Sequence, residues 1–382
     1  MIYLDNSATT KPYREVLETY SKVAEKYFGN PSSLHRLGGE AERVFNEARK
    51  VCAHWLKVNE QEVVFTSGGT ESDNLAVKGT AFQYESRGKH VITTEVEHPA
   101  VKQAFEQLKG FGFDVTYLPA TDGGRISVQD LEKAIRPDTI FVSMIHVNNE
   151  LGTIQPVEEA GKLLARYPKI VFHVDHVQGI TKVPLDFKKS GIDLASLSAH
   201  KFHGPRGVGI LYVRNGVQLK ALLSGGNQES GFRSGTENLP AVAAMAKALR
   251  MSSEASMNQL SHVRRLKNNL AERLSKLEGI DLNTPDEHAA PHILNFSVEG
   301  VKPEVLVHAL SEHGIYVSTR SACSSNESGA SPVLLASGIP LKRAEHAVRI
   351  SLAFDNTEAE IQDTIEAVKA VVPKLRKVGG TR

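Results

Sequence analysis

The chain has 382 residues, of which 41% are apolar and 23% charged, and its formal net charge is +1. This composition is typical of a globular protein large enough for two domains, and the small net charge provides no general attraction to nucleic acid or membrane. No apolar run reaches the length of a membrane-spanning helix, and the first residues lack the basic and apolar regions of a signal peptide. We therefore expect a cytoplasmic protein that binds neither nucleic acid nor membrane directly.

Seven short apolar segments predict β-strands, and helical patterns separate most of them. The segments are Glu62–Thr66, His90–Thr94, Asp114–Leu118, Thr139–His146, Ile170–Val174, Leu194–Leu197 and Val208–Val213. Many of them are apolar on both faces, as buried parallel strands are. Strand–helix alternation of this kind predicts an α/β fold with a mostly parallel seven-stranded sheet flanked by helices. Ligands of such sheets bind where the carboxyl ends of the strands meet.

The pattern changes after about residue 255, which predicts a second, smaller α+β domain. A long charged helix is expected first, followed by a strand, a helix, a short strand, a polar loop, a further strand and a last helix. The expected elements are Leu260–Leu277, His292–Val298, Pro303–His313, Val348–Leu352 and Thr357–Leu375. We assign residues 14–255 to the large domain, and residues 1–13 and 256–382 to the small one, which carries the loop with Cys323.

The two cysteines have different surroundings. Cys52 lies on the apolar stripe of a predicted helix, where the simplest interpretation is a small buried side chain. Cys323 lies in a loop of Ser, Asn, Gly and Ala between Ser318 and Pro332, which is too polar for a core. The two are too far apart in sequence to suggest a zinc site or a disulfide framework. Cys323 is therefore the candidate nucleophile.

Three motifs follow predicted strands. The glycine-rich turn Ser67–Ser72 precedes a helix, so its backbone N–H groups could approach a phosphate, although an ordinary strand–helix turn has the same appearance. Asp175 ends a strand, where a carboxylate can pair with a protonated ring nitrogen and make a cofactor an electron sink. Lys201, in Ser198–Pro205, could supply the amine of a Schiff base. A solvated surface lysine is the alternative, which the flanking Ser, His and Gly-Pro disfavour.

Two further clusters suggest anion binding. Arg233–Asn238 could grip a phosphate, and Arg349 stands on an otherwise apolar strand, where its guanidinium fork needs an anion such as a substrate carboxylate. A metal site at His173, Asp175 and His176 is disfavoured, because no further cluster supplies the remaining ligands. Together these motifs supply two candidate phosphate-binding clusters, a carboxylate that can pair with a ring nitrogen, a lysine, an arginine that can bind a carboxylate, and a thiol. This set fits pyridoxal phosphate chemistry on a sulfur amino acid.

The sequence also resembles the cysteine desulfurases of the iron–sulfur assembly type, which are class V aminotransferase-like, fold type I pyridoxal phosphate enzymes. The resemblance extends from Tyr3 to Leu352, nearly the whole chain, and its motifs are specific. They are Tyr3–Thr10, Gly29–Ser33, Thr66–Ser72, Glu97-His98, Val147–Glu150, Ser198–Lys201, Arg233–Thr236, Ser321–Cys323 and Arg349–Leu352.

The resemblance implies a role for each matching residue. Lys201 would carry the cofactor covalently, Asp175 would pair with its ring nitrogen, His98 would stack on the ring and Gln178 would bond its phenolic oxygen. The phosphate would be held by Gly69, Thr70, Ser198, His200 and, from the partner subunit of a homodimer, Thr236. Asn149 would contact the cofactor and, with Arg349, the carboxylate of L-cysteine. Cys323 would attack the substrate sulfur, leaving alanine and a persulfide that is passed to an acceptor protein.

Three positions depart from the family pattern, namely His176, Arg320 and Ala353, and none of them removes a catalytic group. The sequence leaves open a selenocysteine lyase or another transferase on the same fold, although transamination needs no thiol. It also leaves open a non-catalytic assembly scaffold, against which the retained Lys201, Asp175, His98 and Cys323 argue. Iron–sulfur assembly, tRNA thiolation and cofactor synthesis all remain possible destinations of the sulfur.

Overall fold

The computed structural model describes residues 1–319 and 329–379, so Arg320 and Cys323 lie outside the described residues. Its main feature is a seven-stranded sheet with the order β2-β8-β7-β6-β5-β3-β4. The strands are β2 (Val63–Thr66), β3 (His90–Thr94), β4 (Asp114–Leu118), β5 (Thr139–Ile145), β6 (Val171–Asp175), β7 (Leu194–Ser198) and β8 (Gly209–Val213). Only β8 is antiparallel to its neighbours. The expected mostly parallel sheet is confirmed, with strand ends within one residue of those predicted.

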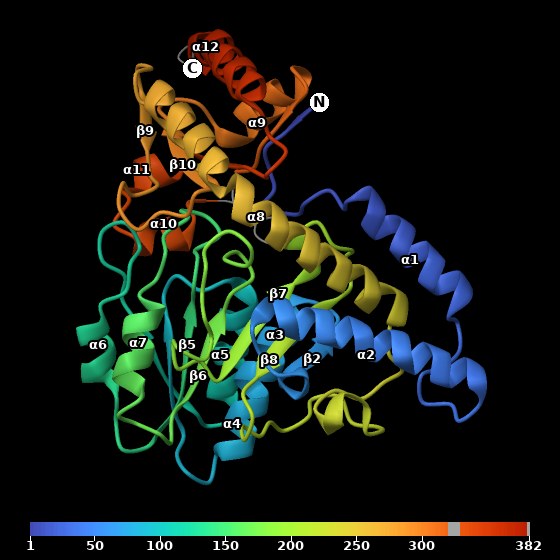
Figure 1. Cartoon of the computed structure of the whole chain (residues 1–382). Helices are drawn as coiled ribbons and strands as arrows, with labels where there is room; N and C mark the ends of the chain where they lie inside the picture. Colours follow the sequence, from blue (N-terminus) through green and yellow to red (C-terminus); the bar gives the residue numbers. More distant parts are fainter. Residues whose placement is uncertain (320–328, 380–382) are drawn as a thin grey trace.

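Helices cover both faces of this sheet (Figure 1). One core joins the sheet to α1 (Arg14–Lys26), α2 (Arg36–Leu56), α6 (Val128–Ala134), α7 (Val157–Leu164) and the first half of α8 (Leu239–Leu274). The other core joins it to η2 (Leu75–Gly79), α4 (Thr80–Tyr84) and α5 (Pro99–Gly110). Cys52 is fully buried in the first core, as its place on the apolar stripe of α2 predicts. Burial on both faces explains why the strands read as continuous apolar runs.

A smaller antiparallel sheet, β12-β10-β9, packs against the C-terminal half of α8 (Figure 1). Its strands are β9 (Ile280–Leu282), β10 (Ile293–Val298) and β12 (Ala347–Ser351), and the two-stranded pair β1 (Ile2–Tyr3) and β11 (Ile315–Tyr316) accompanies it. The helices nearby are α9 (Pro303–Glu312), α10 (Pro332–Ala336), α11 (Leu341–Ala344) and α12 (Glu358–Gly379). Leu4 belongs to the core of this part, so the chain start packs with the chain end.

Helix α8 differs from the prediction. It runs without a break from Leu239 to Leu274, whereas the sequence suggested a helix beginning only at Leu260. Its first half packs in the core of the large sheet, while Val263, Leu266 and Leu270 pack in the core of the small sheet. The proposed domain boundary at residue 255 therefore falls inside one continuous helix.

Within residues 1–319 and 329–379, no helix is both long enough and apolar enough to cross a membrane.

Candidate active site

A cavity of about 130 Å³ lies where the carboxyl ends of β2, β3, β5, β6 and β7 meet loops of the small sheet. Most of the residues that the sequence predicts for cofactor and substrate line this cavity. They are Gly69, Thr70, His98, Asn149, Asp175, Gln178, Ser198, His200, Lys201 and Arg349. The position agrees with the rule that parallel sheets bind ligands at their carboxyl edge.

Lys201 ends the short helix η3 (Ala199–Lys201), which directly follows β7. Its Nζ donates hydrogen bonds to the carbonyl oxygens of Ser7, at 2.5 Å, and Ala8, at 2.9 Å. Its own carbonyl accepts a 3.0 Å hydrogen bond from Nζ of the buried Lys182. Burial, and next the charge of Lys201, lower the pKa of Lys182 to about 8. The lysine amine is thus held inside the cavity by backbone acceptors from the chain start.

Asp175 ends β6 and is buried, with 3% of its surface exposed. Burial raises the pKa of its carboxyl group, while the N–H of Val177, at 3.0 Å from Oδ1, and the charge of Lys201 oppose that rise. The carboxylate therefore has one fixed donor and one cation beside it, which favour its ionised form. Such a group can hold a positive charge on a ligand.

His98 is the N-cap of α5, directly after the turn that follows β3. Its Nδ1 accepts a 3.1 Å hydrogen bond from the N–H of Ala100. Burial, and next the charge of Lys201, lower the pKa of His98 to about 4, so the ring is neutral near pH 7. Because Nδ1 is the acceptor, the proton of the neutral ring is assigned to Nε2.

The glycine-rich turn brings backbone and hydroxyl groups close together. A Cβ atom at Gly69 would lie 3.0 Å from Cγ2 of Val177 and 3.5 Å from Cβ of Ser198. Gly68 has a φ of 149°, which favours glycine. A Cβ on Gly209 would lie 2.7 Å from the Cα of Gly68. Small residues therefore let the turn approach β7 and β8, and this end of the cavity is rich in donors that suit a phosphate.

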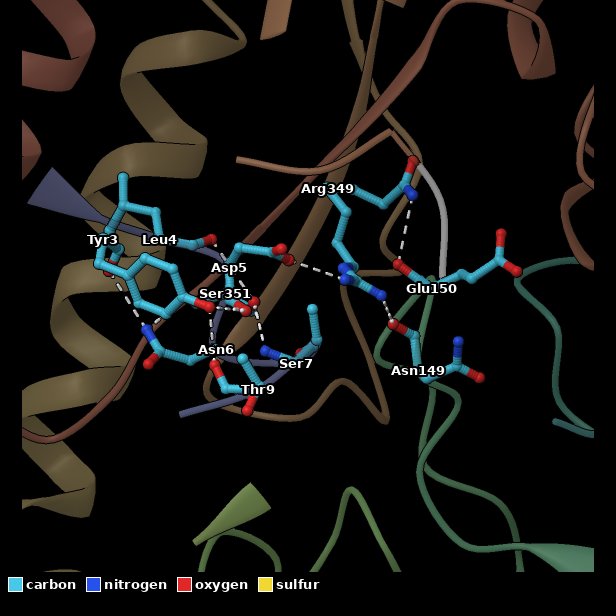
Figure 2. Close-up of polar contacts among 12 residues, drawn as sticks. Tyr3, Leu4, Asp5, Asn6, Ser7, Thr9, Asn149, Glu150, Arg349 and Ser351 are labelled. Carbon is cyan, nitrogen blue, oxygen red and sulfur yellow. Dashed lines mark hydrogen bonds and ion pairs between the residues drawn. The ribbon is translucent and has the colours of Figure 1, made fainter. Parts of the chain in front are cut away.

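Arg349 lies on β12 in the small sheet, lines the cavity and is only 1% exposed. Figure 2 shows its guanidinium between Asp5 and Asn149. Its Nη1 donates to the carbonyl of Asn149 at 2.8 Å, and its Nη2 contacts Oδ1 of Asp5 at 2.9 Å. The sequence predicted an anionic partner for this arginine, and the structure supplies one within the chain. Burial raises the pKa of Asp5, and Arg349 acts in the opposite direction.

Gln178 and His200 are also anchored to the chain start. Nε2 of Gln178 donates to the carbonyl of Ser7 at 2.9 Å, and Nδ1 of His200 lies 3.2 Å from the hydroxyl of Thr9. Burial is the main cause that lowers the pKa of His200 to about 4, with Lys201 as the second. The segment from Ser7 to Thr9 is thus a structural wall of the site, which residue types alone did not indicate.

His176, one of the departures from the family pattern, does not line the cavity. Its Nδ1 lies 2.8 Å from Nδ1 of His146, and its ring contacts Phe187 edge-on. A Cβ on Gly179 would lie 2.5 Å from Nδ1 of His146, so the following glycine leaves room for the pair. The histidine is therefore a buried partner of His146.

Among the predicted site residues that the structure describes, one stands apart from the cavity. Thr236 is exposed and lines a different pocket together with Arg233, Glu229 and Phe65. Cys323 lies outside the described residues. Conversely, the cavity includes Asp73, a buried carboxyl group that sequence reasoning missed. Its place four residues after Gly69 on α3 (Gly69–Asn74) was the available signal.

Comparison with known proteins is consistent along the whole chain. The family model described as aminotransferase class-V matches residues 2–363. A "NifS/IcsS protein homolog" of Lactobacillus delbrueckii subsp. bulgaricus is 46% identical, with 99% of each chain covered. The "Cysteine desulfurase IscS" of Methanosarcina thermophila is 42% identical, covering 99% of this chain and 93% of its own. A solved "NIFS-LIKE PROTEIN" has a TM-score of 0.92 at 39% identity, covering 98% of this chain and 100% of its own.

The expectations of a fold type I architecture and of pyridoxal phosphate as cofactor are confirmed by this family. The chain belongs to the aminotransferase class-V family of pyridoxal phosphate enzymes and, within that family, to the cysteine desulfurases.

Proposed function

We propose that the chain converts L-cysteine to L-alanine and transfers the sulfur to Cys323 as a persulfide. The observation that carries the proposal is the single cavity that contains Lys201, Asp175, His98 and Arg349. An amine, a buried carboxylate, a neutral imidazole and a guanidinium in one cavity suit an amino acid bound to a cofactor with a basic ring nitrogen. Cys323 supplies the thiol that distinguishes desulfuration from transamination.

The donor set of the cavity fits pyridoxal phosphate, which when bound withdraws electrons from the α-carbon of an amino acid. Lys201 would hold the cofactor covalently, Asp175 would face its ring nitrogen and Gln178 its phenolic oxygen, with His98 against the ring. The residues proposed for the phosphate are Gly69, Thr70, Ser198 and His200. Thr236 would add a contact from the partner subunit of a homodimer.

Proton movement follows from the geometry of the side chains. Lys201 lines the same cavity as Asp175 and its charge acts on that carboxyl group, so once the substrate has replaced it on the cofactor its amine can accept and return a proton at the α-carbon of the substrate. His98 has its Nδ1 occupied by the N–H of Ala100, which leaves its Nε2–H to donate. Lysine thus serves as the base, and His98 as a neutral donor.

The substrate carboxylate would bind Arg349 and Asn149. The guanidinium is almost fully buried, and its Nε has no hydrogen-bond partner among the described residues. Asp5 already occupies Nη2, so an incoming carboxylate must share the guanidinium with Asp5 or displace it. Exclusion of water around Arg349 strengthens either arrangement.

The sulfur step is assigned to Cys323. Its thiolate attacks the substrate sulfur, an S–S bond forms, and the C–S bond breaks with its electron pair left on carbon, which then takes up protons to become alanine. The persulfide would pass to an acceptor protein for iron–sulfur cluster assembly, thiolated tRNA or cofactor synthesis. A cytoplasmic homodimer is part of the same proposal.

The test is to incubate the purified protein with L-cysteine and a reductant and to measure alanine and sulfide together. Lys201→Ala and Cys323→Ser should each lose both products, whereas the control Cys52→Ser should keep them. Cys323→Ser should still change the visible spectrum on adding cysteine, since Lys201 and Asp175 are intact. Full activity of Cys323→Ser would refute the assigned nucleophile, and a wild-type protein without a visible cofactor band would indicate a non-catalytic scaffold.

Three finer points need separate measurements. L-Selenocysteine in the same assay distinguishes a lyase that prefers selenium, and transfer of radiolabelled sulfur from L-cysteine to cellular proteins identifies the acceptor. Sedimentation at assay concentration tests the homodimer. An active monomer would remove the proposed role of Thr236.

A further inference from the structure

Asp73 is a buried carboxyl group to which the proposed reaction assigns no task. It lies on α3, is 1% exposed, and lines the same cavity as Asp175. Its Oδ1 is buried and has no hydrogen-bond partner among the described residues. A carboxylate in such a place would be a poorly solvated negative charge.

Among the described residues, Asp73 forms no ion pair with a lysine or an arginine. A row of polar side chains crosses three strands beneath it: His173 of β6 bonds the hydroxyl of Ser143 at 2.8 Å and that of Ser196 at 2.9 Å. Nε2 of His173 is 3.7 Å from Oδ1 of Asp73, too far for a hydrogen bond. Burial lowers the pKa of His173 to about 3, so its ring carries no charge near pH 7. The Ser196 hydroxyl is the one favourable contact that acts on the acidity of Asp73.

The charged groups that act on the acidity of Asp73 are other acids, and one of them, Asp175, lines the same cavity. Burial, then the charge of Asp175, and then that of Glu97 act to raise the pKa of Asp73 well above its usual value. Glu97 is itself buried, with Oε1 accepting from the N–H of Ile145 and the hydroxyl of Thr94, both at 2.9 Å. Burial and the charge of Asp175 raise the pKa of Glu97 to about 8. Carboxyl groups so close together in a low-dielectric site do not all ionise at neutral pH.

The fixed contacts decide which acid of the facing pair ionises. Asp175 has the N–H of Val177 at 3.0 Å and the Lys201 amine as a neighbouring cation. In the described part of the chain, no backbone N–H is among the groups that act on the acidity of Asp73, and no lysine or arginine forms an ion pair with it. The negative charge is therefore more stable on Asp175, and the proton remains on Asp73.

We propose that Asp73 is a positioning residue held as a neutral carboxylic acid at neutral pH, so that a single negative charge, that of Asp175, faces the ring nitrogen of pyridoxal phosphate. The inference rests on the proposed role of Asp175. A second carboxylate on the cavity wall would repel the first and turn it from the ring. A neutral acid keeps the volume of the site without that repulsion.

Infrared spectroscopy of the cofactor-loaded protein at pH 7 tests the charge state directly. With carbon-13 in all aspartate carboxyl groups, the wild type should show a carboxylic-acid carbonyl band that the label shifts. Asp73→Asn should lose this band, while the matched control Glu97→Gln should keep it and lose an unlabelled acid band. Since asparagine copies the shape of a neutral acid, Asp73→Asn should bind pyridoxal phosphate within about threefold of the wild type by equilibrium dialysis.

Absence of the labelled acid band from the wild type at pH 7 would overturn the inference, and this measurement depends on no variant. Persistence of the band in folded Asp73→Asn would also overturn it, because the acid would be another aspartate. The outcome is separable from the proposed function, since the band reports the proton on Asp73 and alanine release reports the reaction. A protein that shows the band but releases no alanine supports the inference and counts against desulfurase activity.

Discussion

The pair of Asp5 and Arg349 joins the chain start to the small sheet and should contribute measurably to stability. The contact is 2.9 Å long, and the side chains are 21% and 1% exposed. Two unit charges at this distance attract by about 6 kcal/mol at an effective dielectric constant of 20, but desolvation of both groups offsets most of that gain. Replacing Asp5 by Asn keeps an oxygen acceptor and removes the charge.

We expect Asp5→Asn to lower the free energy of unfolding by about 2–3 kcal/mol, which lies within the range found for hydrogen bonds to charged groups and reaches the low end of the range for buried charges left without a counterion. Urea denaturation at pH 7 measures this loss. The arginine in the variant has lost its anion, so added propionate should restore part of the stability, whereas chloride at equal ionic strength should not. The wild type, whose arginine is paired, should respond less.

A double-mutant cycle separates the interaction free energy of Asp5 and Arg349 from the other effects of each substitution on stability. In an Arg349→Met background, Asp5→Asn should cost much less than in the wild type, because the buried charge that needs Asp5 is gone. An equal loss in both backgrounds, or a loss below about 0.5 kcal/mol in the wild type, would refute the idea that this ion pair stabilises the site. A strong propionate effect would in turn support the proposed binding of the substrate carboxylate at Arg349.

Three further outcomes are expected. Burial lowers the pKa of His146 to about 4, below the unfolded value, so its contribution to stability is complete above about pH 6.5 and is lost as the pH falls towards 4. In that window, His146→Gln should reduce the slope of the unfolding free energy against pH by up to about 1.4 kcal/mol per pH unit. A slope equal to that of the exposed control His54→Gln would contradict this. Gly209→Ala should weaken cofactor binding at least about tenfold in equilibrium dialysis, because its Cβ would meet Gly68 at 2.7 Å; unchanged affinity would show that the turn can shift without cost. Burial raises the pKa of the Cys52 thiol to about 12, so an alkylating reagent should modify Cys52 only after denaturant is added, and rapid labelling of the folded protein would refute its burial.

The large sheet could be predicted closely because its strands other than the edge strand β4 are buried on both faces, and many of them form mainly apolar runs. The start of α8 could not be predicted from the sequence. Its first half, which includes the buried residues Leu239, Val242, Met245 and Leu249, lacks the polar stripe of a surface helix. The short strand β9 was also missed. Its three residues, with only Ile280 buried, are too few for an alternating pattern to be visible.

In the site, side chains with a chemical signature could be predicted and backbone groups could not. Lys201 and Asp175 stand in recognisable strand-end motifs and do line the cavity. The carbonyl acceptors of Ser7 and Ala8 have no residue-type signal, since any amino acid provides a carbonyl. Asp73 follows a recognised glycine turn, but only the fold shows that it lies opposite another acid without a cation of its own.

The continuous helix α8 connects the large sheet and the small sheet, which each contribute residues to the cavity. Its 36 residues extend for about 54 Å, at 1.5 Å per residue. Lys201 follows a strand of the large sheet and Arg349 lies on a strand of the small one. The orientation of one side of the cavity relative to the other therefore depends on the rotation of α8 about its axis. One residue inserted near its middle would rotate everything beyond it by about 100°. The register of a helix that contributes no residue to the cavity lining thereby affects whether the guanidinium of Arg349 and the amine of Lys201 can contact the same small molecule.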